Sequence, residues 1–376
     1  MKKILKIIAI ISFAFVAAVM MTLPTWAEEI DGYKEFINSI PSDIEKQLPD
    51  AMYSDSIEDI AHGVKEISGI KFLLQEISRC LFSGLNDALP YAVTVLGMLV
   101  ISSLARIISN SFSPDSGALM ESVCSLCVFG AVITGSIGCI EKVNEYFDNL
   151  IALASSYIPL SGALYSMGGN IATAVSSSAS FGIVLTLCEL IMTYTVIPVF
   201  CFCLCIALCS SFERSQALLT IGGIVKKNYI FILSLIMAIL SVSISAQTFI
   251  SAKADNFTMR GAKFVISSFI PHFGGSVSQS LGSVATSVEL LRGAVGIGGV
   301  IIILLMLIPT VVEIAIIRLI YSVCASVAGM LGCNAESGLL GEISSLYGYL
   351  FSVSAICSSV FIISFGLLAR CASAVG

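Results

Sequence analysis

Charged residues are scarce in this sequence: Asp, Glu, Lys and Arg make up 12% of the 376 residues, whereas a soluble domain has about 25%. Histidine occurs twice, at His62 and His272, which excludes the paired histidines of a helical metal site. No basic tract indicates nucleic-acid binding. Hydrophobic residues make up 57% of the chain, and the mean hydropathy is +0.98. We therefore predict an integral membrane protein that contacts the lipid bilayer and no nucleic acid.

The sequence also lacks the motifs of common enzymes. The glycine-rich segment Gly293–Gly299 does not end in the Lys-Ser/Thr pair of a phosphate-binding loop. Cys124 and Cys127 have the spacing of half a zinc site, but no second pair follows outside the apolar segments. Most of the 13 cysteines lie in apolar segments, where they are typical of small packing residues. We predict no catalytic residue, no cofactor and no metal, and therefore a protein that is not an enzyme.

The N-terminus has the pattern of a secretory signal. Lys2, Lys3 and Lys6 precede an apolar segment from Ile7 to Met21, and Thr25-Trp26-Ala27 places small residues at the positions that a signal peptidase reads. This order of basic, apolar and small residues predicts a signal peptide over residues 1–27. An uncleaved membrane anchor is the alternative interpretation.

Residues 28–87 form a polar, acidic region that we expect to be helical and extracytoplasmic. Ser42 and Glu45 have the spacing of a capping box at a helix start. From Ile57 to Leu85, apolar residues recur at intervals of three and four, which predicts one amphipathic helix. That helix either lies on the membrane or its own domain, or provides a docking face for a partner.

Residues 88–376 are predicted to form an all-α, polytopic membrane domain with six or seven transmembrane helices. About 20 apolar residues cross a bilayer as a helix. The apolar runs cover residues 88–108, 122–140, 181–211, 229–250, 293–331 and 347–368. Pro198 and Pro309 lie inside the two longest runs, where proline kinks or divides a helix. The basic connector from Arg214 to Lys227 is expected to be cytoplasmic, on the side opposite to residues 28–87.

A weak internal repeat marks two segments rich in Gly, Ser and Pro. Ser-Ser-Tyr-Ile-Pro ends at Pro159, Ser-Ser-Phe-Ile-Pro ends at Pro271, and each is followed by small residues. Short Gly/Pro-broken segments at matching positions indicate the working part of a transporter or pore. Close packing of helices through small residues is the alternative. The candidate channel or packing residues are Pro159, Gly162, Gly169, Pro271, Gly274 and Gly282.

Ionisable residues inside apolar runs complete the set of candidates, because burying a charge in lipid is costly. Glu189 lies deep in the run that follows the first repeat. Glu289 and Arg292 are three residues apart, so they can pair on one helix. Glu313 and Arg318 are five residues apart and are expected to meet different partners. These charges either conduct or hold helices and subunits together.

Several segments resemble a known family. They are Lys253–Phe257, Ser268–Pro271 and Leu290–Gly299, read together with the signal and the acidic N-terminal region. These segments resemble the stage III sporulation protein AE family of endospore-forming Firmicutes, most closely from Lys253 to Gly332. The matching motifs contain no catalytic residue.

The resemblance implies a multi-pass cell membrane protein of the mother cell, placed at the engulfed forespore. It implies a subunit of a channel complex likened to specialised secretion systems, with other membrane subunits and a separate ATPase as partners. A homo-oligomer is a further expectation. A secondary transporter of a small solute, with its site at the two broken segments, remains the alternative from the residues alone.

Overall fold

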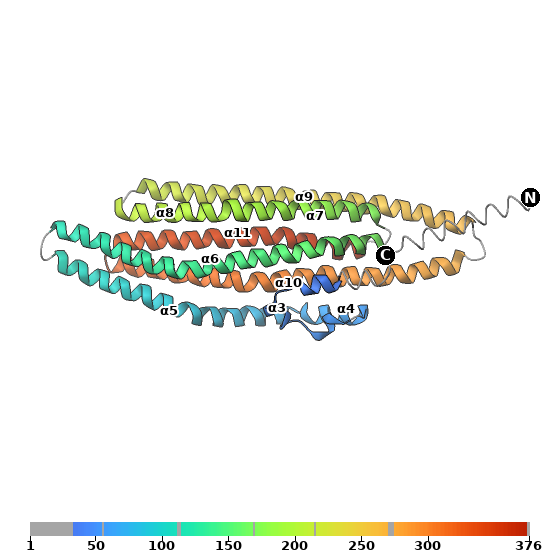
Figure 1. The fold of residues 1–376 in the computed structure, drawn as a ribbon, viewed down its shortest axis with the longest axis horizontal. Coiled ribbons are helices and arrows are strands. Elements are labelled where there is room, and N and C mark those ends of the chain that lie inside the picture. Colours follow the sequence, from blue (N-terminus) through green and yellow to red (C-terminus); the bar gives the residue numbers. More distant parts are fainter. Residues whose placement is uncertain are drawn as a thin grey trace, which may run out of the picture.

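The computed structural model describes residues 33–54, 56–110, 114–167, 170–213, 216–269 and 274–373. These residues form an elongated bundle of helices, and no strand occurs among them (Figure 1). The predicted signal peptide lies outside the described residues, as does Pro271. The all-α prediction is therefore confirmed.

Among the described residues, six long helical segments lie along the bundle, and each runs antiparallel to the one before it in the chain (Figure 1). Each contains a stretch that is apolar enough and long enough to cross a membrane. The prediction of a multi-span membrane domain is therefore confirmed, with six spans in the described residues. The segments are α5 (Ile70–Asn110), α6 (Pro114–Met167), α7 (Ile171–Ile191) continued by η2 (Met192–Val196) and α8 (Ile197–Glu213), α9 (Gln216–Phe269), α10 (Gly274–Met330) and α11 (Asn334–Ser373).

The six segments pair as three helical hairpins. The connections before α6, α9 and α11 lie toward one end of the bundle, and the α6–α7 and α9–α10 connections lie toward the other (Figure 1). The described N-terminal region and the C-terminal end of α11 lie toward the end of the bundle where α6 is followed by α7 and α9 by α10. An even number of spans requires this arrangement, because each crossing reverses the chain.

Several helices are far longer than a bilayer is thick. At about 1.5 Å per residue, the 54 residues of α6 and the 54 of α9 span about 80 Å, against ~30 Å of hydrocarbon. Residues 141–156 and 253–268 lie beyond the predicted apolar runs, but they do not form separate helices. Each continues a span without a break, and neither contains a proline that would interrupt the helix.

The chain reverses direction near both repeats, but not at equivalent positions. Helix α6 continues through Pro159 and Gly162 and ends at Met167, so the Ile-Pro step of the first copy is helical. The second copy lies at the end of α9, and α10 begins at Gly274. Proline within a membrane helix is tolerated where neighbouring groups satisfy the freed carbonyl. The prediction of broken backbone at Pro159 and Gly162 is therefore corrected.

Pro198 distorts the third segment without dividing it. The five residues Met192–Val196 form a π-helix immediately before it, which relieves the clash between the proline ring and the preceding turn. The hydroxyl of Tyr349 donates to the Val196 carbonyl at 3.3 Å and so satisfies part of the loosened turn. Pro309, in contrast, lies inside the continuous helix α10.

The polar N-terminal region packs against the bundle. It contains a helical stretch at 33–38, the short α3 (Ser42–Glu45), η1 (Asp50–Tyr53) and α4 (Ile57–Ile67). The residue that precedes α3 is Pro41, and Ser42 makes no side-chain cap, so the capping-box prediction is wrong. The predicted single helix from Ile57 to Leu85 is divided, because α4 ends at Ile67 and α5 begins at Ile70.

An aromatic cluster joins this region to the bundle. The rings of Tyr157 and Phe365 lie 3.7 Å apart between centroids, and Phe36 and Phe181 pack around them. All four side chains are nearly completely buried. The Ser39 hydroxyl lies 2.8 Å from that of Ser156. The first repeat therefore contributes Tyr157 to the core of the protein.

Glycines let α10 approach α11 and α4 closely. A Cβ at Gly296 would lie 2.6 Å from the backbone nitrogen of Ala369, and one at Gly299 would overlap the Phe365 ring. A Cβ at Gly298 would meet Val64 of α4 at 3.2 Å. The glycine-rich segment that is not a phosphate-binding loop is thus a packing surface of the kind small residues provide between membrane helices.

Candidate functional site

Asp255 on α9 caps the start of α7. Its carboxylate accepts hydrogen bonds from the backbone N–H of Ala172 at 3.1 Å and of Thr173 at 2.8 Å, and from the Thr173 hydroxyl at 2.7 Å. The carboxylate is buried. The first N–H groups of a helix have no partner within it, and the helix dipole favours a negative charge there. Asp255 satisfies both requirements from a different helix.

Arg292 on α10 binds the end of α6. Its Nε donates to the carbonyl of Leu164 at 2.9 Å, and its guanidinium lies 5.5 Å from the ring centre of Tyr165. The residue is 3% exposed. A cation near the last carbonyls of a helix complements the negative end of the helix dipole. The contacts that the structure shows for Arg292 are therefore with α6, and its pairing with Glu289 stays a prediction.

Asp255 and Arg292, the capping pair, therefore hold the two sides of the α6–α7 connection. They come from α9 and α10, which are themselves joined end to end near the second repeat. The carboxylate binds the N-terminus of α7 and the guanidinium binds the C-terminus of α6. The first repeat region is thus held by charged side chains of α9 and α10 that lie outside the second repeat.

A buried ion pair joins α9 to α11. The Nζ of Lys226 donates to Glu342 at 2.6 Å and to the Ser345 hydroxyl at 2.9 Å, and the Lys226 side chain is 6% exposed. Glu342 is 24% exposed. From the sequence, Lys226 was predicted only as part of the cytoplasmic connector Arg214–Lys227. The structure places it inside a helix contact.

We expect neutralising Lys226 alone to destabilise the protein by about 2 kcal/mol, because Glu342 would lose its cation in a largely apolar contact. The measurement is the thermal unfolding midpoint of Lys226→Met in detergent. The double variant Lys226→Met/Glu342→Met should lose less, since no lone charge remains. Lys46→Met, at an exposed position, is the control; equal losses for both single variants would contradict the role of the pair.

A polar cavity of about 410 Å³ lies between α5, α6 and α10. At its edge the Nζ of Lys142 donates to both oxygens of Glu313, at 2.8 and 2.9 Å. Asp87, Asn86 and Tyr91 also line it. The prediction that Glu313 and Arg318 meet different partners is confirmed: the Arg318 guanidinium lies against Gly348 instead. Intramembrane charges that line a cavity are functional candidates.

The remaining predicted residues do not converge on one site. Glu189 is exposed on the outside of α7. Glu289 lines a separate cavity of about 420 Å³ between α4, α10 and α11, together with Lys65. A Cβ at Gly162 would meet the Ser178 hydroxyl at 3.0 Å, so this glycine allows close approach of α7. Gly274 and Gly282 lie in the first part of α10, whereas Gly169 lies outside the described residues.

Tyr33 and Cys333 are among the groups outside the spans whose pKa values are shifted. Burial raises the pKa of the Tyr33 phenol, whose hydroxyl donates to the Met52 carbonyl at 2.8 Å. Burial and then the nearby Glu336 carboxylate raise the pKa of the Cys333 thiol. Both groups are neutral near pH 7, so they act in packing. Within the described residues, no cluster of His, Cys, Asp and Glu is arranged to hold a metal ion.

Sequence reasoning missed Asp255, Lys142 and Glu342 as contact residues. Asp255 lies in the segment used for the family resemblance, but its capping partners are 82 and 83 residues away along the chain. Lys142 lies just beyond the predicted apolar run 122–140. An isolated charge that flanks an apolar run is the available signal, and it does not name the partner.

Charges buried between six long apolar helices define a polytopic helical membrane protein whose ionisable side chains join its helices. The chain matches the model of the family described as Stage III sporulation protein AE over residues 52–372, and it belongs to this family. Stage III sporulation protein AE of Bacillus subtilis (strain 168) is 24% identical over 347 residues, which cover 89% of this chain and 84% of the relative. No solved structure matches the chain. The family membership implies a role in sporulation.

Proposed function

We propose that the chain is a non-enzymatic membrane subunit of a multiprotein channel or secretion-like complex that connects mother cell and forespore during endospore formation. Its place is the mother-cell membrane around the forespore, and its partners are other membrane subunits, a separate ATPase and further copies of itself. Family membership supports the sporulation role. The placement of the charges supports the subunit role.

The observation that carries this proposal is the use of charge in helix contacts. Asp255, Arg292 and Lys226 each bind a group on another helix. A coupled transporter needs a titratable group at an enclosed site near the midplane. Glu189, the best candidate in the sequence, is exposed on the outside of α7. This arrangement favours a scaffold that assembles with partners.

The transporter is the second candidate because of one observation, the cavity that holds Asp87, Lys142 and Glu313. The experiment that separates the two is purification from sporulating cells in mild detergent, with identification of co-purifying proteins. A stable assembly with other membrane proteins supports the channel subunit. A chain that purifies alone and binds a small solute supports the transporter.

Neutralising Glu189 is expected to leave function intact. Gln is nearly isosteric with Glu and removes the charge, and the exposed position leaves no buried partner unpaired. Glu189→Gln should sporulate at least half as well as the parent, and Glu189→Leu should do so too because an apolar side chain suits a lipid-facing surface. The measurement is sporulation efficiency in the native host. A dead Glu189→Gln that still inserts and co-purifies with its partners would show that the charge itself is needed.

A further inference from the structure

An open groove of about 420 Å³ lies where α4 rests on α10 and α11. Val64 and Lys65 belong to its α4 wall, and Glu289 and Ile297 belong to its α10 wall. Most of the lining is apolar, and the charged side chains in it are Lys65 and Glu289. The groove therefore presents one cation and one carboxylate, on two different helices, within an otherwise apolar surface.

The groove lies at the level where two apolar runs end. On α10 the run begins at Gly293, directly after Arg292, and on α11 it ends at Leu368, directly before Ala369. These ends coincide in space, because a Cβ at Gly296 would meet the backbone nitrogen of Ala369 at 2.6 Å. Gly293 and Ala369 both line the groove. Two neighbouring helices thus leave their apolar runs at this level.

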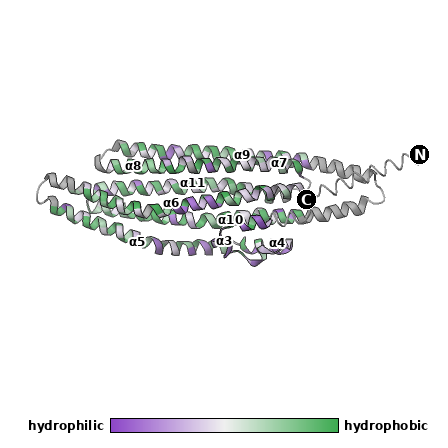
Figure 2. Cartoon of the chain, viewed as in Figure 1, coloured by the Kyte–Doolittle hydropathy of each residue, from purple (hydrophilic) through white to green (hydrophobic). Residues whose placement is uncertain are grey.

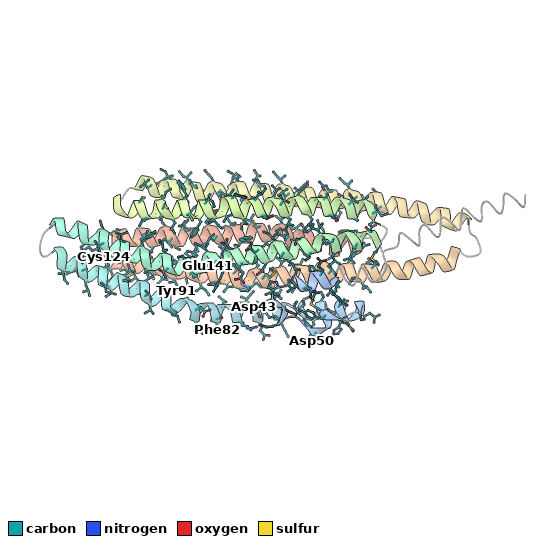
Figure 3. The ribbon with its side chains drawn as sticks, in the orientation of Figure 1. Asp43, Asp50, Phe82, Tyr91, Cys124 and Glu141 are labelled. Carbon is teal, nitrogen blue, oxygen red and sulfur yellow. The ribbon has the colours of Figure 1, made fainter. Side chains whose placement is uncertain are left out.

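Charged groups that bind other helices lie at the same level. Arg292 donates to the Leu164 carbonyl near the end of α6, and Asp255, which follows the apolar run of α9, binds the start of α7. Exposed charged side chains cover the outer side of α4. Figure 2 shows hydrophilic residues gathered around α3 and α4, and Figure 3 labels Asp43 and Asp50 in this region. Ends of apolar runs beside an amphipathic helix are typical of the headgroup layer of a bilayer.

The α10 side of the groove has an exposed apolar surface. Leu290 is 52% exposed and Ile297 is 45% exposed, and they are seven residues apart, so they share one face of the helix. Sites for small ligands have volumes of about 300–1,000 Å³, whereas a helix with its side chains is about 10–12 Å wide. The groove thus has the size of a lipid headgroup site, with an apolar surface for acyl chains beside it.

We propose that this groove binds a phospholipid whose zwitterionic headgroup carries a primary amine, as in phosphatidylethanolamine. The Lys65 ammonium binds the phosphate, the Glu289 carboxylate accepts hydrogen bonds from the amine, and Leu290 and Ile297 contact the acyl chains. An anionic headgroup without an amine places like charge beside Glu289, and a trimethylated amine has no N–H to donate. The site goes beyond the proposed channel function and does not depend on it.

The test is stabilisation of the purified protein by lipid in detergent. The thermal unfolding midpoint is measured while short-chain phosphatidylethanolamine, phosphatidylcholine or phosphatidylglycerol is added. A ligand that binds the folded state raises the midpoint as its concentration increases. We expect phosphatidylethanolamine to reach its half-maximal shift at a concentration on the order of tenfold lower than the other two, because its amine alone donates charge-assisted hydrogen bonds to Glu289.

Charge-neutral variants separate the two halves of the headgroup. Glu289→Gln should remove the preference for phosphatidylethanolamine, whereas Lys65→Gln should weaken the binding of all three lipids on the order of tenfold, because all three contain the phosphate. Glu66→Gln is the matched control, since Glu66 is exposed on the same helix but does not line the groove. The midpoint of each variant without lipid shows whether it is folded.

The apolar surface has its own variant. Leu290→Gln should weaken all three lipids by roughly fivefold, as the loss of an apolar contact of about one CH₂ group predicts, and should leave the preference for phosphatidylethanolamine unchanged. Leu74→Gln is the control, because Leu74 is 59% exposed on α5 and does not line the groove.

Three results would overturn the proposal. Equal shifts with the three lipids, or no shift with any of them, mean that the groove does not recognise this headgroup. A preference that survives Glu289→Gln, or that Glu66→Gln removes, places the lipid outside the groove. Leu290→Gln and Leu74→Gln with equal effects would exclude the α10 surface as the acyl-chain contact. The proposed subunit function stands in each case, because co-purification with other membrane proteins is a separate measurement.

Discussion

Replacing Asp255 with alanine is expected to destabilise the protein by roughly 3 kcal/mol or more. The change leaves two backbone N–H groups at the start of α7 and the Thr173 hydroxyl without their acceptor, and each unsatisfied buried donor costs about 1–3 kcal/mol. Helix α7 would also lose the charge that complements its dipole. The measurement is the thermal unfolding midpoint in detergent, together with sporulation efficiency.

A graded series sharpens this test. Asp255→Asn keeps an acceptor oxygen and should fall between the parent and Asp255→Ala. Asp43→Ala removes a carboxylate whose side chain is 90% exposed and should change the midpoint little. If Asp255→Ala and Asp43→Ala unfold at the same temperature, the capping pair does not hold the α6–α7 connection.

A single methyl group at Gly299 is expected to separate α10 from α11. The added Cβ would overlap the ring of Phe365, which is itself packed on Tyr157 in the aromatic cluster. Neither side has room to move, and overpacking a tight core costs about 1–3 kcal/mol or more. Gly299→Ala should therefore lower the unfolding midpoint sharply and reduce the amount of inserted protein.

The same helix supplies a matched control. A Cβ at Gly293 meets nothing within 4 Å, so Gly293→Ala should be neutral or slightly stabilising, since alanine favours helix. Adding Phe365→Leu to Gly299→Ala should recover part of the loss, because the smaller side chain makes room. Losses that simply add in the double variant would argue that the two residues do not compete for the same space. Gly348 is unsuitable as a control because its Cβ would meet Arg318 at 3.1 Å.

The spans could be predicted from the sequence because lipid imposes a simple rule on them. Each apolar run of residues 88–376 had to become a helix, and there are six such helices among the residues that the structure describes. Their true lengths could not be predicted. Residues 141–156 are polar on one face, a pattern that also describes a separate surface helix. Residues 141–156 contain no Gly or Pro, and this absence was the better indication that the helix continues through them.

Similar sequence did not predict similar backbone in the two repeats. Pro159 lies inside α6, whereas the second Ile-Pro falls between α9 and α10. A proline is compatible with either position, and packing decides: Tyr157 beside Pro159 is held in the aromatic cluster. The candidate charges were found for the same reason that the spans were, because a charge among apolar residues stands out. Their partners, such as Leu164 for Arg292, depend on how distant segments meet.

The long helices have a mechanical consequence. A rod of 57 residues such as α10 has a length of about 85 Å, so some 50 Å of it lies beyond the ~30 Å hydrocarbon layer. An irregular segment with the same number of residues would vary in its end-to-end length, whereas packed helices keep that length constant. The number of residues in each helix thus sets how far the protein extends from the lipid surface. That length determines where it can contact a neighbouring component.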